Sequence, residues 1–107
     1  MDLTKKKCVP CEGGVDPFTD EEIKTYQSYL KTQWDIVDGK KIERMFKFKD
    51  FREAMEFVNK VADIANEEDH HPDILINYSR VTITLWTHAI GGLSANDFIV
   101  AAKIEKI

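Results

Sequence analysis

A long amphipathic segment in the middle of the chain is the feature that most constrains the fold. Between residues 51 and 65, apolar side chains recur at helical spacing while charged residues fill most of the other positions. The apolar positions are Phe51, Ala54, Val58, Val61, Ala62 and Ala65. Asp50 precedes them and can cap the first turn. One face of such a helix has to be buried, so the rest of the chain must supply a second layer.

Strand patterns flank this helix on both sides. Before it, residues 34–48 read as two strands joined by Asp38-Gly39, a dipeptide that tolerates the positive φ angles of a hairpin turn. After it, apolar and polar residues alternate over residues 74–86, with a turn near Ser79. Two hairpins are therefore expected, one on each side of the long helix.

Two shorter helices complete the pattern. Thr19 and Glu22 fit a capping box, in which each side chain accepts a hydrogen bond from the other residue's backbone N–H, and this helix is predicted to run to about residue 30 or 31. Ser94 and Asp97 open a last helix whose apolar residues nearly encircle it. A helix that is apolar on more than one side needs further cover, and a protein partner, most simply another copy, would supply it.

The order of elements is α-β-β-α-β-β-α, which favours a four-stranded antiparallel sheet with three helices packed on one face. The expected fold class is therefore α+β. A chain of 107 residues suits a single core. We expect an irregular N-terminal arm over residues 1–18 and a single domain over residues 19–107.

Charge and composition exclude several kinds of partner. A net charge of -4 argues against a grip on phosphate backbones, so no direct nucleic-acid partner is expected. No window approaches the roughly 20 apolar residues of a membrane span, and the basic run at residues 5–7 is not followed by an apolar stretch of signal-peptide length. The sequence thus predicts a cytoplasmic protein.

Cys8 and Cys11 form a C-x-x-C motif in the N-terminal arm. A second pair, or a nearby histidine that would complete a four-coordinate zinc site, is missing from the local sequence. Three interpretations stay open: a surface feature of a mobile arm, a disulfide or redox role, and half of a metal site.

The three histidines of the chain, His70, His71 and His88, lie close together in the sequence. Any one of them could be an ordinary loop histidine, but three together favour a functional site. Imidazole has an ordinary pKa near 6.5, so one histidine can donate a proton while another accepts one. Loss of water needs such a pair, because the departing hydroxyl must be protonated and a neighbouring atom must lose a proton.

A metal site is the competing chemical interpretation, because three imidazole nitrogens could bind an ion and leave a position open for water. Adjacency argues against it. Neighbouring side chains in an extended segment point to opposite sides, so His70 and His71 would face one ion only with unusual backbone geometry. Acid/base chemistry without a metal is therefore the favoured interpretation.

The stretch that starts with His70-His71-Pro72 and continues through Tyr78 and His88 to Asp97 resembles the signature of the pterin-4a-carbinolamine dehydratases. Residues 91–99 are similar to that family's entry into its final helix, and the C-x-x-C arm is similar to one common in bacterial members. The resemblance covers nearly the whole chain. It implies four antiparallel strands with three helices on one side, assembled as homodimers or homotetramers.

The resemblance also implies the reaction: removal of water from 4a-hydroxytetrahydropterin to give quinonoid dihydropterin, without a metal or organic cofactor. This step recycles the pterin cofactor of aromatic amino acid hydroxylases, which implies a functional link to such an enzyme. By position, His70 and His88 would be the acid/base pair, and His71 would contact the pterin and share in proton transfer. The neighbouring backbone of the substrate pocket would come from Pro72, Thr87 and Ala89.

Two carboxylates are candidate supporting residues. Asp97 lies three residues after Ser94, where it would stabilise the first helical turn by about 0.3 to 1 kcal/mol, and the family signature makes it part of the site; support of the site is the favoured role. Asn66 stands where a charged residue is usual, so a nearby acid such as Asp69 would have to tune His70.

Two other functions are kept as alternatives. Animal members of the family also act as dimerisation cofactors for a homeodomain transcription factor, which would make the chain a protein-binding module. A metal-dependent hydrolase is the second alternative, and it would use the same three histidines.

Overall fold

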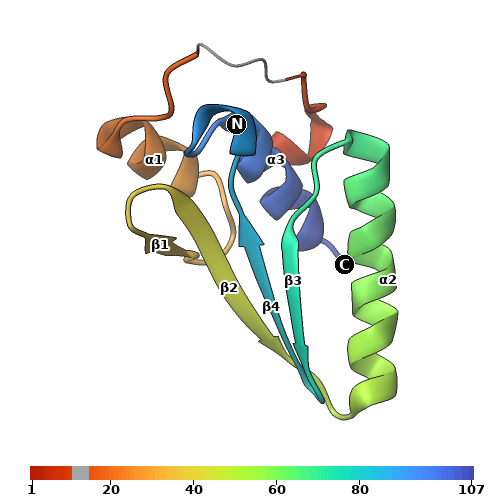
Figure 1. Ribbon diagram of the computed structural model, residues 1–107. Helices are drawn as coiled ribbons and strands as arrows, with labels where there is room; N and C mark the ends of the chain where they lie inside the picture. Colours follow the sequence, from red (N-terminus) through yellow and green to blue (C-terminus); the bar gives the residue numbers. More distant parts are fainter. Residues whose placement is uncertain (11–14) are drawn as a thin grey trace.

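The computed structural model describes residues 1–10 and 15–107, and these residues form one antiparallel sheet covered by helices (Figure 1). The main elements are α1 (Asp20–Gln27), β1 (Asp35–Val37), β2 (Lys41–Lys47), α2 (Phe51–Glu68), β3 (Asp73–Asn77), β4 (Arg80–Leu85) and α3 (Ala95–Ile104). Two short 3-10 helices, η1 (Leu3–Lys5) and η2 (His88–Ile90), accompany them. The α+β class and the order α-β-β-α-β-β-α are confirmed. Within the described residues, no helix is both long enough and apolar enough to span a membrane.

The four strands follow the order β1-β2-β4-β3, and every neighbouring pair is antiparallel. The register places Ile42 opposite Leu85 and Phe46 opposite Val81, so one face of the sheet is apolar and packs against the helices. The first hairpin turns at Asp38-Gly39 with φ angles of 53° and 66°, as the dipeptide predicts. The second turns at Tyr78-Ser79, near Ser79 as expected, but Tyr78 takes a φ of 51° in the turn and does not extend β3.

Helix α2 is capped by Asp50, whose carboxylate accepts a hydrogen bond from the Glu53 N–H over 2.9 Å. Its buried face is the predicted one at Ala54, Val58, Val61 and Ala65, and Phe57 and Glu68 are buried as well. Ala62 is half-buried, and Phe51, which was expected on the buried face, is 48% exposed. Phe51 stands in the first turn of α2, which lies at the bottom of Figure 1.

Helix α3 begins after Ser94, and the predicted capping arrangement of Ser94 and Asp97 is present. Its apolar residues from Phe98 to Ile104 are buried within this one chain. The expectation that a second copy must cover this helix is therefore wrong. The N-terminal 3-10 helix η1 packs against α3, and Leu3 is left only 2% exposed.

Helix α1 ends at Gln27, three or four residues earlier than predicted. The chain continues in tighter turns, in which the N–H groups of Tyr29 and Leu30 bind carbonyls three residues back. Trp34 follows and is fully buried, and its indole N–H donates to Glu105 just after α3. This contact ties the connection between α1 and β1 to the end of α3.

Candidate active site

A cavity of about 600 Å³ lies where the end of α2, the end of β4 and the start of α3 meet. All three histidines line it, together with Thr87 and Ala89. Pro72, which was expected at the pocket, is not among the lining residues. The volume falls within the range of ordinary small-molecule sites.

The first two histidines reach the cavity because α2 stops abruptly before them. Asp69 takes the left-handed conformation, with φ 50° and ψ 42°, and its N–H still binds the carbonyl of Ala65. The His70 N–H binds the same carbonyl over 3.1 Å. This left-handed cap turns the chain out of the helix and toward β3, so His70 and His71 stand at the top of α2.

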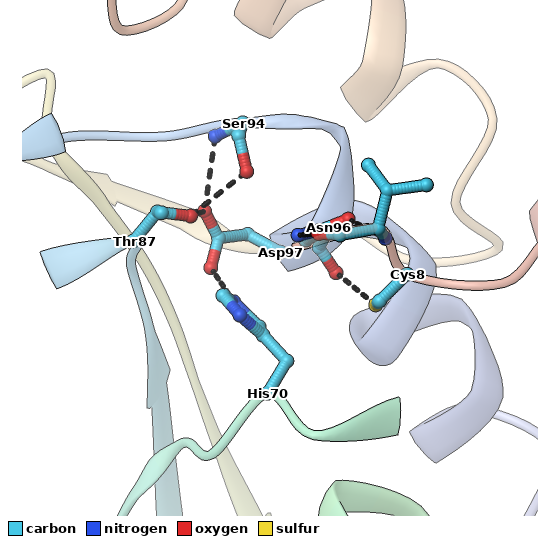
Figure 2. Close-up of polar contacts among 7 residues, drawn as sticks. Cys8, His70, Thr87, Ser94, Asn96 and Asp97 are labelled. Carbon is cyan, nitrogen blue, oxygen red and sulfur yellow. Dashed lines mark hydrogen bonds and ion pairs between the residues drawn. The ribbon is translucent and has the colours of Figure 1, made fainter. Parts of the chain in front are cut away.

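Asp97, in the first turn of α3, holds His70 by a direct contact (Figure 2). Its Oδ1 lies 2.6 Å from His70 Nε2, and its Oδ2 accepts hydrogen bonds from the Thr87 hydroxyl over 2.8 Å and the Ser94 N–H over 3.0 Å. The carboxylate is 0% exposed. Because a carboxylate only accepts, His70 Nε2 carries the shared proton, which leaves Nδ1 as the basic nitrogen of the neutral ring.

The other two histidines have different partners. His71 Nε2 lies 3.1 Å from Asn66 Oδ1. The His88 ring stacks on Trp86 with a centroid separation of 3.9 Å and an interplanar angle of 34°. Lys41 Nζ lies 4.6 Å from the centre of the same Trp86 ring.

The structure refines what was expected of Asp69, Asp97 and Thr87. Asp69 lines the cavity, but the carboxylate that contacts His70 is Asp97. The roles considered for Asp97, first-turn stabiliser and support of the site, coexist, because one oxygen binds Ser94 N–H and the other binds His70. Thr87 was expected to offer only backbone, yet its hydroxyl joins the Asp97 network.

Sequence reasoning missed several lining residues: Lys7, Cys8, Val9, Pro10, Glu68, Trp86 and Asn96. Glu68 had a detectable signal. It lies three residues after Ala65 and seven after Val61, and so continues the buried stripe of α2 with a charged side chain. A charge in that position needs a partner. The remaining residues follow no periodic pattern.

Cys8 has a fixed place beside the cavity. Its N–H donates to Glu68 Oε1 over 2.8 Å, and its Sγ lies 3.6 Å from the Asn96 carbonyl (Figure 2). Burial raises the pKa of the Cys8 thiol to about 12, and the charge of Glu68 adds to the rise. Cys8 is therefore a thiol at neutral pH and not a mobile surface group. Cys11, the other half of the C-x-x-C motif, lies outside the described residues.

Glu68 joins this segment to α3. Its Oε2 accepts a hydrogen bond from Lys103 Nζ over 2.7 Å while its Oε1 accepts from Cys8. Burial alone would raise the pKa of Glu68, but the hydrogen bonds from Lys103 and Cys8 and the charge of Lys103 outweigh it and bring that pKa below the ordinary 4.5.

The lowered pKa of Glu68 predicts a loss of stability in acid. A group whose pKa is lower in the folded state stabilises the fold above its unfolded pKa of 4.5 and loses that contribution as pH falls through the folded value. Urea unfolding of the wild type and of Glu68→Gln should therefore give unfolding free energies that differ most at neutral pH and converge below pH 4.5. Exposed Glu56, replaced in the same way, is the matched control and should show no such convergence. A constant difference at every pH would contradict the assignment.

The described residues, 1–10 with 15–107, contain no group of three or more His, Cys, Asp and Glu side chains placed to hold a metal ion. His70 Nε2 faces Asp97 and His71 Nε2 faces Asn66. The two adjacent histidines thus each use one nitrogen on a different partner.

Sequence comparison finds a family model over most of the chain and many relatives. The model described as "Pterin 4 alpha carbinolamine dehydratase" matches residues 16–107. A predicted pterin-4-alpha-carbinolamine dehydratase of Alkaliphilus metalliredigens is 46% identical over 104 residues, which cover 97% of this chain and 94% of that protein. A protein of the same description from Rubrobacter xylanophilus is 44% identical over 106 residues, covering 99% and 98%.

Solved structures give a consistent result. The crystal structure of a transcriptional coactivator/pterin dehydratase from Brucella melitensis matches with a TM-score of 0.78 and 37% identity, over 85% of this chain and 97% of that one. A pterin dehydratase-like protein identified as a RuBisCO assembly factor in the alpha-carboxysome matches with a TM-score of 0.61 over 71% and 89%. At 19% identity, the second match shows a shared fold only.

Proposed function

This chain belongs to the pterin-4-alpha-carbinolamine dehydratase family, and we propose that it removes water from 4a-hydroxytetrahydropterin to give quinonoid dihydropterin. The observation that carries the proposal is the buried Asp97 carboxylate bound to His70 at a cavity that His88 also lines. Two histidines at one cavity can supply the acid and the base that a dehydration needs.

The environments of the two histidines favour separate roles. His70 has its Nε2 proton held by Asp97, so Nδ1 is free of that proton and is suited to take the proton from N5 of the pterin. His88, at the start of η2, lines the same cavity, so it is placed to protonate the hydroxyl on C4a. The C4a–O bond breaks, the N5 electron pair forms the C4a=N5 bond, and one water leaves. Proton exchange with solvent then resets both rings.

His71 is proposed to contact the pterin and to share in proton transfer, with its ring held by Asn66. The reaction would recycle the pterin cofactor of an aromatic amino acid hydroxylase, and the protein would act in the cytoplasm beside that enzyme. Both of these statements rest on the resemblance to the family, and no cofactor is part of the proposed reaction.

The direct test is a dehydratase assay on freshly generated 4a-hydroxytetrahydropterin. Turnover well above the spontaneous rate is the expected result, because positioned acid and base groups each contribute about 10²- to 10⁴-fold. A protein that binds dihydropterin without accelerating the reaction would instead be a binding module that has kept the fold.

Activity should be unchanged by chelators. The adjacent histidines use their Nε2 atoms on Asp97 and Asn66, so no shared ion is needed to place them. Dialysis against EDTA followed by the dehydratase assay checks this, with the metal content measured in parallel. Activity that is lost to the chelator and restored by zinc would favour a metal-dependent hydrolase with the same histidines.

We further propose that the protein is a homodimer or homotetramer. Strand β3 lies at an edge of the sheet, where its outer backbone groups lack a neighbouring strand among the described residues. Leu75 on this strand is 56% exposed, and Tyr78 in the following turn is 67% exposed. Sedimentation at micromolar concentration should give at least twice the 12.4 kDa monomer mass. A single monomeric species would refute the proposal.

A further inference from the structure

We infer that the N-terminal segment Lys7–Pro10 forms a wall of the pterin pocket and contributes to substrate binding, an inference that rests on the proposed function. These four residues line the same cavity as the three histidines. The matched family model begins only at residue 16, so this wall lies outside the residues that the family model matches.

Two buried side chains fasten the segment to the body of the protein. Asn96 binds Val9 twice, since its Oδ1 accepts from the Val9 N–H over 3.1 Å and its Nδ2 donates to the Val9 carbonyl over 2.6 Å. Glu68 accepts from the Cys8 N–H over 2.8 Å. Asn96 is only 3% exposed and Glu68 is also buried. The backbone of the segment is thus held in a defined position.

The same two helix ends fasten the segment and place the proposed base. Asn96 adjoins Asp97 in the first turn of α3 (Figure 2), and Glu68 lies two residues before His70 at the end of α2. Asp97 and His70 bind each other, while Asn96 and Glu68 bind the N-terminal segment. The position of the wall relative to His70 is therefore fixed by Asn96 and Glu68, which are buried and close in sequence to Asp97 and His70.

The flanking residues are anchored too. On one side Leu3 is buried in the core against α3. On the other side the Phe18 N–H binds the Leu93 carbonyl over 2.8 Å, and Pro17 packs so tightly on Gly92 that a Cβ added there would lie 2.6 Å from the Pro17 Cβ. The wall therefore lies between two points that are fixed to the helical layer.

A wall built from backbone and from an exposed Val9 touches no group that takes part in proton transfer. Its contacts with the pterin are the same before and during loss of water, so they stabilise the bound substrate and the transition state equally. Removing them should raise KM and leave kcat nearly unchanged. A purely structural effect transmitted through His70 would lower kcat instead.

The test compares Val9→Pro with Val9→Ala. Proline removes the N–H that donates to Asn96, whereas alanine keeps it. Val9 itself is 66% exposed. Val9→Pro should raise KM, and the Kd of 7,8-dihydropterin as a stable probe, by roughly three- to tenfold, which is the effect of one lost hydrogen bond. Val9→Ala keeps the N–H and loses only side-chain contact, so it should raise KM and Kd by clearly less than Val9→Pro does.

Amide exchange and a second variant make the test decisive. In the wild type the Cys8 and Val9 amides should be protected, and Val9→Pro should expose the Cys8 amide. Asn96→Ala removes both hydrogen bonds to Val9, so it should raise KM at least as much as Val9→Pro, and adding Val9→Pro to it should raise KM little further. Unprotected amides in the wild type, an unchanged Kd in Val9→Pro, or a fall in kcat at constant KM would each overturn the inference. Dihydropterin binding is measured without turnover. The role of residues 7–10 in binding can therefore be tested even if the protein lacks dehydratase activity.

Discussion

Replacing His70 or His88 with alanine should lower kcat for dehydration about 10²- to 10⁴-fold while the fold stays intact, because each change removes a proposed acid or base. This corresponds to roughly 3 to 5.5 kcal/mol of transition-state stabilisation. His88 is exposed and His70 lies at the cavity surface, so neither ring is a large part of the core. Steady-state kinetics checked by circular dichroism will measure both effects.

Controls for this prediction come from the N-terminal cysteines. Cys8→Ser and Cys11→Ser should leave kcat nearly unchanged, and serine at position 8 keeps the backbone N–H that binds Glu68. The double histidine variant should lose less than the sum of the two single losses, because both rings act on one step. Equal losses in the cysteine and histidine variants, or near-normal turnover in His70→Ala with an unchanged spectrum, would rule out the assignment.

Replacing Asp97 should damage both catalysis and stability. In Asp97→Asn the amide cannot accept from His70, Thr87 and Ser94 as the carboxylate does, so His70 loses the partner that fixes its Nε2 proton. A loss of about 10²- to 10⁴-fold in kcat is expected, as for other carboxylates that orient a catalytic histidine. Asp97→Ala leaves three donors without this acceptor in a buried place and should cost about 3 to 5 kcal/mol of unfolding free energy.

Urea unfolding and kinetics on the same preparations separate these two effects. The matched control is Asp63→Asn on the exposed side of α2, which should leave both quantities unchanged. If Asp97→Asn folds normally and keeps full kcat, Asp97 does not orient a catalytic base. The capping of α3 by Asp97 would then be its whole contribution.

The helices and strands could be predicted because each has a periodic apolar pattern, a helix-capping residue or a recognisable turn. The Thr19 and Asp50 caps, the Asp38-Gly39 turn and the alternation after Pro72 are local signals, and the structure confirms them. Where the structure differs, the period alone does not decide how far each position is covered. Phe51 belongs to the apolar stripe and lies in the first turn of α2, yet it is 48% exposed.

The candidate site was predictable in part. The clustered histidines and the spacing to Asp97 identified the residues that line or support the cavity, but not which carboxylate meets His70. The hydrogen bonds of Asn96 and Glu68 to the backbone of Val9 and Cys8 join residues far apart in sequence and repeat with no period. The periodicity of side chains along the sequence does not predict a hydrogen bond from a side chain to a distant backbone amide.

The packing of Leu3 against α3 has a consequence for how the chain folds during its synthesis on the ribosome. Leu3 precedes and α3 follows the other main elements in the chain, so the contact between them closes a loop that spans nearly all of the described residues. During synthesis the hairpins and α2 leave the ribosome before α3 does, so their apolar faces lack the cover that α3 later supplies. We expect those faces to be open to chaperones until α3 has emerged and packed on them.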